Sequence, residues 1–152
     1  MDTINPRTCP DVMVRAPPPD NDTDANYERY WYARVLGIYH VKVSTTHSDV
    51  LNGNKIRRME FLWVRWLGSE PKHKHGFCRA VLPKIGFVPF TDDFAFGFLD
   101  PEHVIRSCHL IPAFWYGRTS DLLPVEQTNA RRLQQHGQPH ETDDWTNFYV
   151  NM

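Results

Sequence analysis

The alternation of apolar and polar residues predicts short β-strands along most of this chain. From Tyr30 to Val43 every second residue is apolar or small, which is typical of an extended strand with one buried face. The residues expected on that face are Trp31, Ala33, Val35, Gly37, Tyr39, Val41 and Val43, with Arg34, His40 and Lys42 on the other. Gly37 within this alternation predicts a bulge or a sharp bend.

A second apolar run, MEFLWVRWL, predicts a strand that is covered on both faces. One face would hold Met59, Phe61, Trp63 and Leu67, and the other Leu62, Val64 and Trp66. The Asn52-Gly53 dipeptide between the two runs favours a tight turn, so we expect a hairpin with a long tip. We expect Trp31 and Trp63 in the core and Trp66 exposed. Arg65 should pair with a carboxylate or reach solvent, because a lone buried guanidinium is costly.

Shorter elements follow these two strands. The segment VLPKIGFVPF is interpreted as a short strand near a sheet edge, because it is broken by Pro83 and Pro89. A turn at residues 100–102 precedes a predicted strand from Val104 to Ile111, and DDWTNFYVNM is compatible with a last strand. One or two helical turns could lie between Val125 and Gln135. Such a series favours an antiparallel barrel over βαβ units.

We therefore predict a mainly β protein, a small SH3-like or BAH-like antiparallel β-barrel of five or six strands. Composition divides the chain into three parts. Residues 1–26 are rich in Pro and Asp and are expected to be a flexible leader. Residues 27–117 would form the barrel, and residues 118–152 an irregular C-terminal extension packed on it.

Charge and cysteine content narrow the class of protein. The 152 residues are 41% hydrophobic and suit one domain, while a formal net charge of -1 gives no overall basic field for nucleic acid. Three widely spaced cysteines and the lack of a long apolar run indicate a reduced, intracellular protein that does not enter a membrane. The oligomeric state stays open.

The order of several strings resembles a known segment. These strings are WYARVLGIYHV, MEFLWVRWLG, KIGFVPF, FAFGFLDPEHVIRSCHLIPAFWYGRT and DDWTNFYVNM. Together they resemble a segment of fungal proteins that are linked to Plavaka and KDZ-type DNA transposons, in which further chain follows. The likeness runs from about Tyr30 to Met152 and implies a transposon-associated setting, but no particular chemistry.

A second resemblance is to BAH domains, which are chromatin-associated modules built on an SH3-like barrel. The matching residues are Tyr32, Ala33, Arg34, Val35 and Ile38 in the first strand, Val64, Arg65 and Trp66 in the second, and Ile105, Cys108, His109 and Leu110 in a later one. BAH domains bind nucleosomes, modified histone tails or protein partners. This resemblance therefore implies a nuclear binding module rather than an enzyme.

The candidate binding residues lie beside the first two strands. Tyr32 and Trp66 fall on the faces opposite Trp31 and Trp63, so we expect them to form an aromatic surface bordered by Arg34. Three basic residues after the Asn-Gly turn, Lys55, Arg57 and Arg58, could contact phosphates there. The expected partner is a protein tail or a nucleic acid, bound without a cofactor.

Catalytic and metal-binding alternatives are weaker in the sequence. The carboxylates Asp92, Asp93, Asp100, Glu102, Asp143 and Asp144 could hold a divalent ion in a degenerate metal-dependent nuclease or transposase, yet turn chemistry explains several of them. A zinc site from His73, His75, Cys78, Cys108 and His109 lacks the usual ligand spacing. A nucleophile at Cys108 with His40 or His103 lacks any sign of activation. We therefore predict no catalytic and no metal site.

Overall fold

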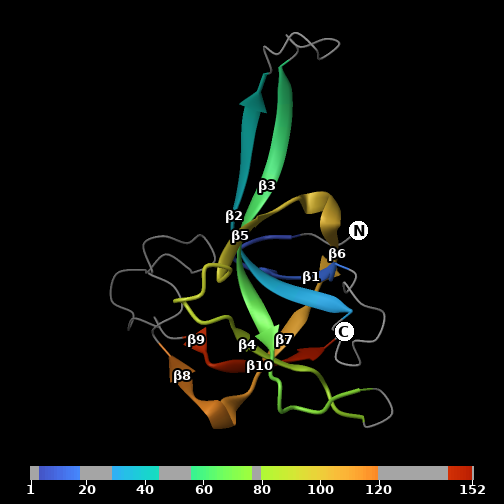
Figure 1. Ribbon diagram of the computed structural model, residues 1–152, viewed down its shortest axis with the longest axis vertical. Helices are drawn as coiled ribbons and strands as arrows, with labels where there is room; N and C mark the ends of the chain where they lie inside the picture. Colours follow the sequence, from blue (N-terminus) through green and yellow to red (C-terminus); the bar gives the residue numbers. More distant parts are fainter. Residues whose placement is uncertain (1–3, 18–28, 45–55, 77–79, 120–143, 152) are drawn as a thin grey trace.

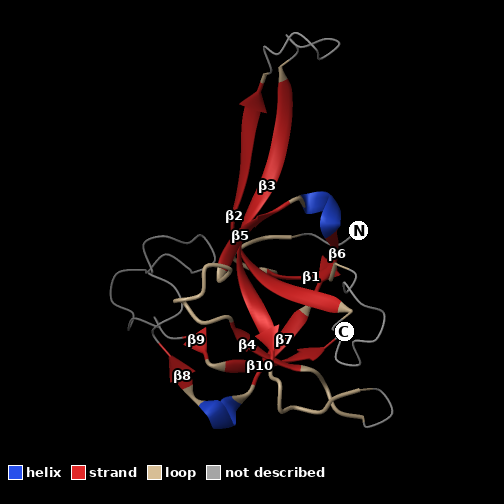
Figure 2. Ribbon diagram, viewed as in Figure 1, coloured by secondary structure: helices blue, strands red, loops and turns tan. Residues whose placement is uncertain are grey.

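The protein is mainly β, with antiparallel strands, as a computed structural model of the chain shows (Figures 1 and 2). The structure describes residues 4–17, 29–44, 56–76, 80–119 and 144–151. The strands are β1 (Asp11–Arg15), β2 (Tyr30–Val43), β3 (Arg57–Ser69), β4 (Lys84–Phe87), β5 (Phe96–Leu99), β6 (Val104–Ser107), β7 (His109–Pro112), β8 (Arg118–Thr119), β9 (Asp144–Trp145) and β10 (Asn147–Asn151). Two 3-10 helices, η2 (Pro101–His103) and η3 (Phe114–Tyr116), complete the described elements, and neither of these helices is long and apolar enough to cross a membrane.

One sheet contains most of these strands. Its order is β6-β1-β2-β3-β4-β10-β7, with β5 paired to β3, while β8 and β9 form a separate pair. The first and last strands of this order, β6 and β7, are consecutive in the chain and are separated by Cys108 alone. The Cys108 N–H donates to the Asp11 carbonyl at 2.9 Å. The hydrogen bonds between β1 and this segment therefore continue to the residue that follows β6. The predicted strand from Val104 to Ile111 is thus two strands.

The predicted hairpin of the two long apolar runs is confirmed as β2 and β3, and so is the bulge at Gly37. Val35 lies opposite Val64 and Gly37 opposite Trp63, which leaves Leu36 as the extra residue. The predicted single alternation through β2 is wrong, because one extra residue exchanges the faces of every later side chain. A Cβ on Gly37 would lie 2.5 Å from the Tyr39 ring, so this position accommodates only glycine without a shift.

Two apolar clusters lie on opposite faces of β1, β2 and β3. One contains Met13, Tyr32, Leu67, Ile85, Leu110, Phe148 and Val150. The other contains Val12, Val14, Ala33, Val35, Leu62, Val64 and Leu99. The prediction that both faces of β3 are covered is therefore confirmed for the half of the strand that pairs with β4 and β5.

The predicted domain limits need correction at both ends. β1 lies within the supposed flexible leader, yet Val12 and Val14 are buried and β1 pairs with both β2 and β6. Its DVMVR sequence is too short to stand out among prolines, and its burial depends on distant strands. β10 forms the predicted last strand and pairs with β4 and β7, so residues 118–152 are not all irregular.

The predicted edge position of the KIGF strand is wrong, because β4 lies between β3 and β10. Pro83 and Pro89 flank β4 and do not interrupt it, and the Pro83 carbonyl accepts from the Val150 N–H at 2.9 Å. The predicted turn at Asn52-Gly53 and the helical turns between Val125 and Gln135 lie outside the described residues.

Candidate binding site: an aromatic pocket

A pocket of about 450 Å³ lies where β2 begins and β3 ends. Its lining residues are Tyr30, Trp31, Tyr32, Trp66, Leu67, Gly68, Ser69, Val88 and Phe94. The structure thus brings together Tyr32 and Trp66, the two aromatic residues that the sequence selected. It adds aromatic neighbours that the sequence analysis did not select for this surface.

Trp66 is fixed in place by the segments on both sides of it. Its N–H donates to the Ala95 carbonyl at 3.0 Å, and its carbonyl accepts from the Val88 N–H at 3.1 Å. Gly97 allows the indole to approach closely, because a Cβ there would lie 2.8 Å from Trp66 Nε1. The rings of Trp31 and Trp66 meet edge to face at 5.9 Å, so the pocket has a wall of two tryptophans.

The exposure of the two β2 aromatics is the reverse of the prediction. Trp31 is 45% exposed, because it packs against Trp66 at the pocket and not in the centre of the core. Tyr32 is only 4% exposed, because it shares its face with its register partner Leu67 in the cluster that contains Phe148. Tyr32 therefore lines the pocket as a buried residue of that cluster, and Trp31 is the exposed aromatic residue of β2 there.

Phe94 is the most exposed of the aromatic pocket residues that sequence reasoning missed. Its N–H donates to Asp92 Oδ1 at 2.9 Å, and the Ala95 N–H donates to the Asp92 carbonyl at 3.0 Å. This turn leaves the Phe94 side chain largely exposed at the pocket. The signal in the sequence was an aromatic directly after the TDD turn, where a core position is not expected.

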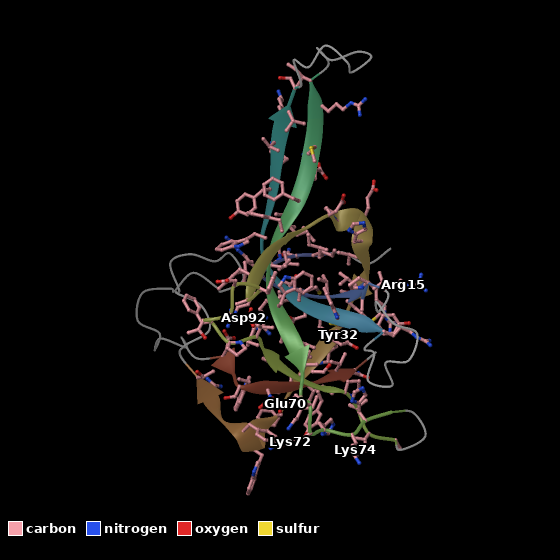
Figure 3. All side chains as sticks on the ribbon, in the orientation of Figure 1. Arg15, Tyr32, Glu70, Lys72, Lys74 and Asp92 are labelled. Atoms are coloured by element: carbon pink, nitrogen blue, oxygen red, sulfur yellow. The ribbon has the colours of Figure 1, made fainter. Side chains whose placement is uncertain are left out.

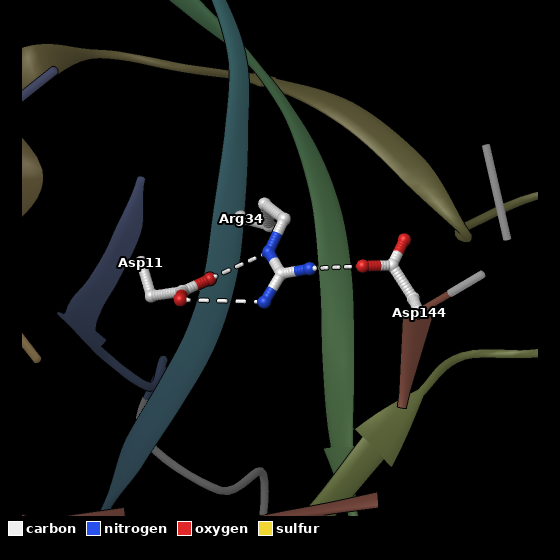
Figure 4. A network of polar contacts seen from close by, with 3 residues as sticks. All are labelled: Asp11, Arg34 and Asp144. Atoms are coloured by element: carbon white, nitrogen blue, oxygen red, sulfur yellow. Dashed lines mark hydrogen bonds and ion pairs between the residues drawn. The ribbon is translucent and has the colours of Figure 1, made fainter. Parts of the chain in front are cut away.

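Arg34 does not border the pocket as a free cation. Its Nε donates to Asp11 Oδ1 at 2.9 Å and its Nη1 to Asp144 Oδ1 at 3.0 Å (Figure 4). The guanidinium also lies over the rings of Phe87 and Phe148, at 5.1 and 5.2 Å. Burial alone would lower the pKa of Arg34, but the two carboxylates outweigh it and the pKa is raised. Arg34 therefore holds β1, β2 and β9 together.

Arg65 lies directly opposite Arg34 in the β2–β3 register and is fully buried. Its Nη2 donates to the Val88 carbonyl at 2.9 Å, and its guanidinium lies 4.8 Å from the centre of the Phe96 ring. Its Nε and Nη1 have no hydrogen-bond partner within the described residues. Burial lowers the pKa of Arg65. The predicted carboxylate or solvent contact is wrong, because aromatic faces take that place.

The basic tip is not part of the same groove. Arg57 and Arg58 are exposed, Arg58 pairs with Glu60 at 2.8 Å, and Lys55 lies outside the described residues. Strand β2 runs from the pocket at Tyr32 to Val43 beside the tip. At about 3.3 Å per strand residue, this stretch is roughly 35 Å long. The expected joint surface of aromatic and basic residues is therefore two separate surfaces.

Among the acidic and thiol candidates, Asp92, Asp100 and Cys108 have features that favour a structural role. Asp100 Oδ1 accepts from the Glu102 N–H at 2.9 Å, so Asp100, like Asp92, makes the turn contact that the sequence suggested. Burial raises the pKa of the Cys108 thiol to about 12, which disfavours the thiolate that a nucleophile needs.

The proposed zinc ligands are only partly described. Within the described ranges, no three His, Cys, Asp or Glu side chains are grouped closely enough to hold a metal ion. Cys78 and Asp143 lie outside those ranges. His73 Nε2 is 2.9 Å from the Leu82 carbonyl, and its ring lies 6.2 Å from that of His75.

Comparison with known proteins adds no relative to this picture. A scan against protein-family models gave no match, and searches of curated proteins and of solved structures gave none either.

Proposed function

We propose that this protein is a non-catalytic interaction module that binds a protein tail in the aromatic pocket. The observation that supports this most directly is the pair of tryptophans, the exposed Trp31 and the half-buried Trp66, which line a pocket of about 450 Å³ together with the exposed Phe94. Apolar concave sites with fixed aromatic walls are the usual form of a ligand pocket. The hydrogen bonds on both sides of Trp66 reduce the ordering that binding would require.

An SH3-like or BAH-like barrel is the architecture that we propose for this module. The support is the strand order, in which β6 and β7 are consecutive in the chain but occupy opposite ends of the sheet path. A continuous segment that bonds both ends favours a sheet that curls on itself. The chromatin or transposon setting, and with it an intracellular and nuclear location, is proposed from the sequence resemblances alone.

The ligand side chain that we propose for the pocket is a lysine, preferably a methylated one. A cation over aromatic faces gains about 0.5–2 kcal/mol, depending on how dry the site is. The protein already makes such contacts internally, since Lys84 Nζ lies 4.1 Å from the centre of the Tyr116 ring. Asp92 and Asp93 precede Phe94, so acidic residues lie in the same turn as one pocket wall.

Three peptides that differ only at one position test this assignment. The position is lysine, trimethyl-lysine or norleucine, and binding is measured by calorimetry at low and high salt. We expect trimethyl-lysine to bind best and with mild salt dependence. Trp66→Ala and Phe94→Ala should each weaken it at least about tenfold. Trp115→Ala is the matched control, because Trp115 is exposed and does not line the pocket.

Other outcomes would replace the proposal. Equal binding of all three peptides, or none, would remove the lysine assignment. Binding of single-stranded DNA that falls steeply with salt and is lost on Arg57→Ala with Arg58→Ala, but kept in Trp66→Ala, would move the function to the basic tip. Cleavage of DNA that requires Mg²⁺ or Mn²⁺ and is lost on Asp93→Asn would favour the metal-dependent enzyme.

A further inference from the structure

The β2–β3 hairpin continues beyond its bulge as a two-stranded extension, which we call the outer hairpin (residues 38–43 and 57–61). It projects away from the rest of the sheet, and side chains extend from it along its length (Figures 1 and 3). At about 3.3 Å per residue its β2 part is roughly 20 Å long.

One face of the outer hairpin is apolar and exposed. Tyr39 lies opposite Phe61, and Val41 lies opposite Met59, so these four side chains share a face. The Tyr39 and Phe61 rings stack at 5.7 Å. Val41 is 43% exposed and Met59 55%, and the exposed Phe98 ring extends the same face at 5.4 Å from Phe61. Contiguous exposed apolar residues of this kind mark interaction surfaces.

Both edges of the outer hairpin are open within the described residues. β1 pairs with β2 only as far as Arg34, and β5 pairs with β3 only between Leu62 and Arg65. The remaining N–H and C=O groups of these edges can therefore accept another strand. A two-stranded ribbon alone is marginally stable in water, and a third strand is the usual way to stabilise it.

The charges of the outer hairpin indicate what kind of strand would fit. His40 and Lys42 lie on β2, and Arg57 and Arg58 on β3. The one described acid among these residues is Glu60, which pairs with Arg58 at 2.8 Å. Lys42 and Arg57 have no carboxylate partner in the part of the chain that the structure describes. This excess of positive charge belongs to a chain whose formal net charge is -1.

We infer that the outer hairpin is a second binding surface, at which an acidic, extended segment of a partner protein adds as a strand to the open edge of β2 at residues 38–43. Alternate apolar side chains of that segment would cover Tyr39 and Val41, and its carboxylates would approach Lys42 and His40. A nucleic acid would use the positive charge but would leave the apolar face uncovered, so the protein strand fits more of what is observed. The pocket at Trp66 lies at the other end of the hairpin, so this surface is independent of the proposed function.

Two fluorescent peptides provide the probe. One alternates valine with glutamate, and the other alternates valine with lysine. Fluorescence polarisation should show binding of the glutamate peptide only. Hydrogen exchange should slow at the amides of residues 38–43 in the complex, which a contact confined to side chains would not produce.

Variants then locate the contact. Val41→Glu removes apolar area and adds a like charge, and Lys42→Glu reverses the local charge, so each should weaken binding at least about tenfold. Ile105→Glu is the matched control, because Ile105 is 49% exposed on β6. It should bind as the parent does, and so should Trp66→Ala, which reports on the pocket alone.

Several results would overturn this inference. It fails if neither peptide binds, if the lysine peptide binds equally well, or if Ile105→Glu weakens binding as much as Val41→Glu does. A concentration-dependent dimer that Val41→Glu abolishes would assign the face to a second copy of the chain. Duplex DNA binding that requires Lys42 and Arg57 but not Val41 would assign it to nucleic acid.

Discussion

The two halves of the β2–β3 hairpin are built from the same kinds of residue but differ in their surroundings. In the inner hairpin, residues 30–35 and 62–69, the sheet extends on both sides through β1 and through β4 and β5, and most apolar side chains are buried. In the outer hairpin, residues 38–43 and 57–61, no described strand flanks the pair, and apolar side chains on both strands are exposed. Alternating apolar and polar residues are enough to predict a strand, but whether its apolar side chains are buried depends on the neighbouring strands.

The charged residues show the same contrast. Arg34 in the inner hairpin is enclosed by Asp11 and Asp144, and its side chain is only 12% exposed. Arg58 in the outer hairpin makes its contact with Glu60 in water, with a side chain that is 61% exposed. The inner ion pairs are therefore part of the folded core, whereas the outer pair contributes little to stability.

The largest expected difference in stability between the two halves of the hairpin comes from replacing these two arginines. Arg34→Met would remove the cation that pairs with the buried Asp11 and the half-buried Asp144, and we expect it to lower the free energy of unfolding by about 3–5 kcal/mol. Arg58→Met, the matched change in the outer hairpin, should cost at most about 1 kcal/mol. Urea denaturation of both variants measures this, and equal losses would mean that the outer hairpin is as much a part of the core as the inner one.

Apolar truncation should give the next largest difference. Leu62 is buried against the β1–β3 cluster, so Leu62→Ala should cost about 2–5 kcal/mol. Val41→Ala, in the exposed face of the outer hairpin, should stay within about 0.5 kcal/mol of the parent. Thermal unfolding followed by circular dichroism compares the two. A large loss for Val41→Ala would show that its face is covered in the free protein.

The two facing arginines of the inner hairpin sharpen the comparison further. Arg65 has one hydrogen bond to a carbonyl and three neighbouring phenylalanine rings, and no described carboxylate is bonded to it. Because no described carboxylate is bonded to Arg65, an apolar side chain of similar length would remove the cost of burying the charge and would leave no buried carboxylate behind. We therefore expect Arg65→Met to differ from the parent by less than about 1 kcal/mol in urea. A loss as large as that of Arg34→Met would refute this distinction.

The last prediction concerns thiol reactivity and not stability alone. In a chain with Cys9 and Cys78 replaced by serine, Cys108 should react with a disulfide reagent at pH 8 roughly tenfold to hundredfold more slowly than a cysteine placed at Val41, because its pKa is raised to about 12. The raised pKa of Cys108 also determines how the free energy of unfolding changes with pH. The unfolded thiol loses its proton at lower pH than the folded one, so the free energy of unfolding should fall as pH rises from 9.0 toward about 12. Equal labelling rates would contradict this burial.

Local pattern predicted much of this fold. The hairpin, its bulge, the last strand and the turn roles of Asp92 and Asp100 all follow from short-range signals. The position of β4 inside the sheet and the inclusion of β1 in the core could not be predicted from the sequence, because both depend on pairing between distant segments. The wrong assignment of Trp31 to the core and of Tyr32 to the surface has the same cause. The neighbouring strands decide which face of β2 is covered, and local pattern does not identify those strands.

The candidate site was predicted only in part. Trp66 and Tyr32 were selected as neighbours and do line one pocket, but the roles of Arg34 and Arg65 were not foreseen. Asp144 is far from Arg34 in sequence, and nothing in its local context distinguishes an ion-pair partner from a turn residue. The three rings around Arg65 come from residues 87–96, which local pattern does not connect with β3.

The strand order also has a consequence for how the chain folds over time. β1 bonds β2 and then β6, whereas β10 bonds β4 and β7, so segments from the two ends of the chain complete opposite sides of the sheet. Pairings between residues so far apart in sequence slow folding, because long loops must be ordered before the contacts form. During synthesis β4 and β7 must wait for the last strand, and their edges remain available to other chains until it emerges.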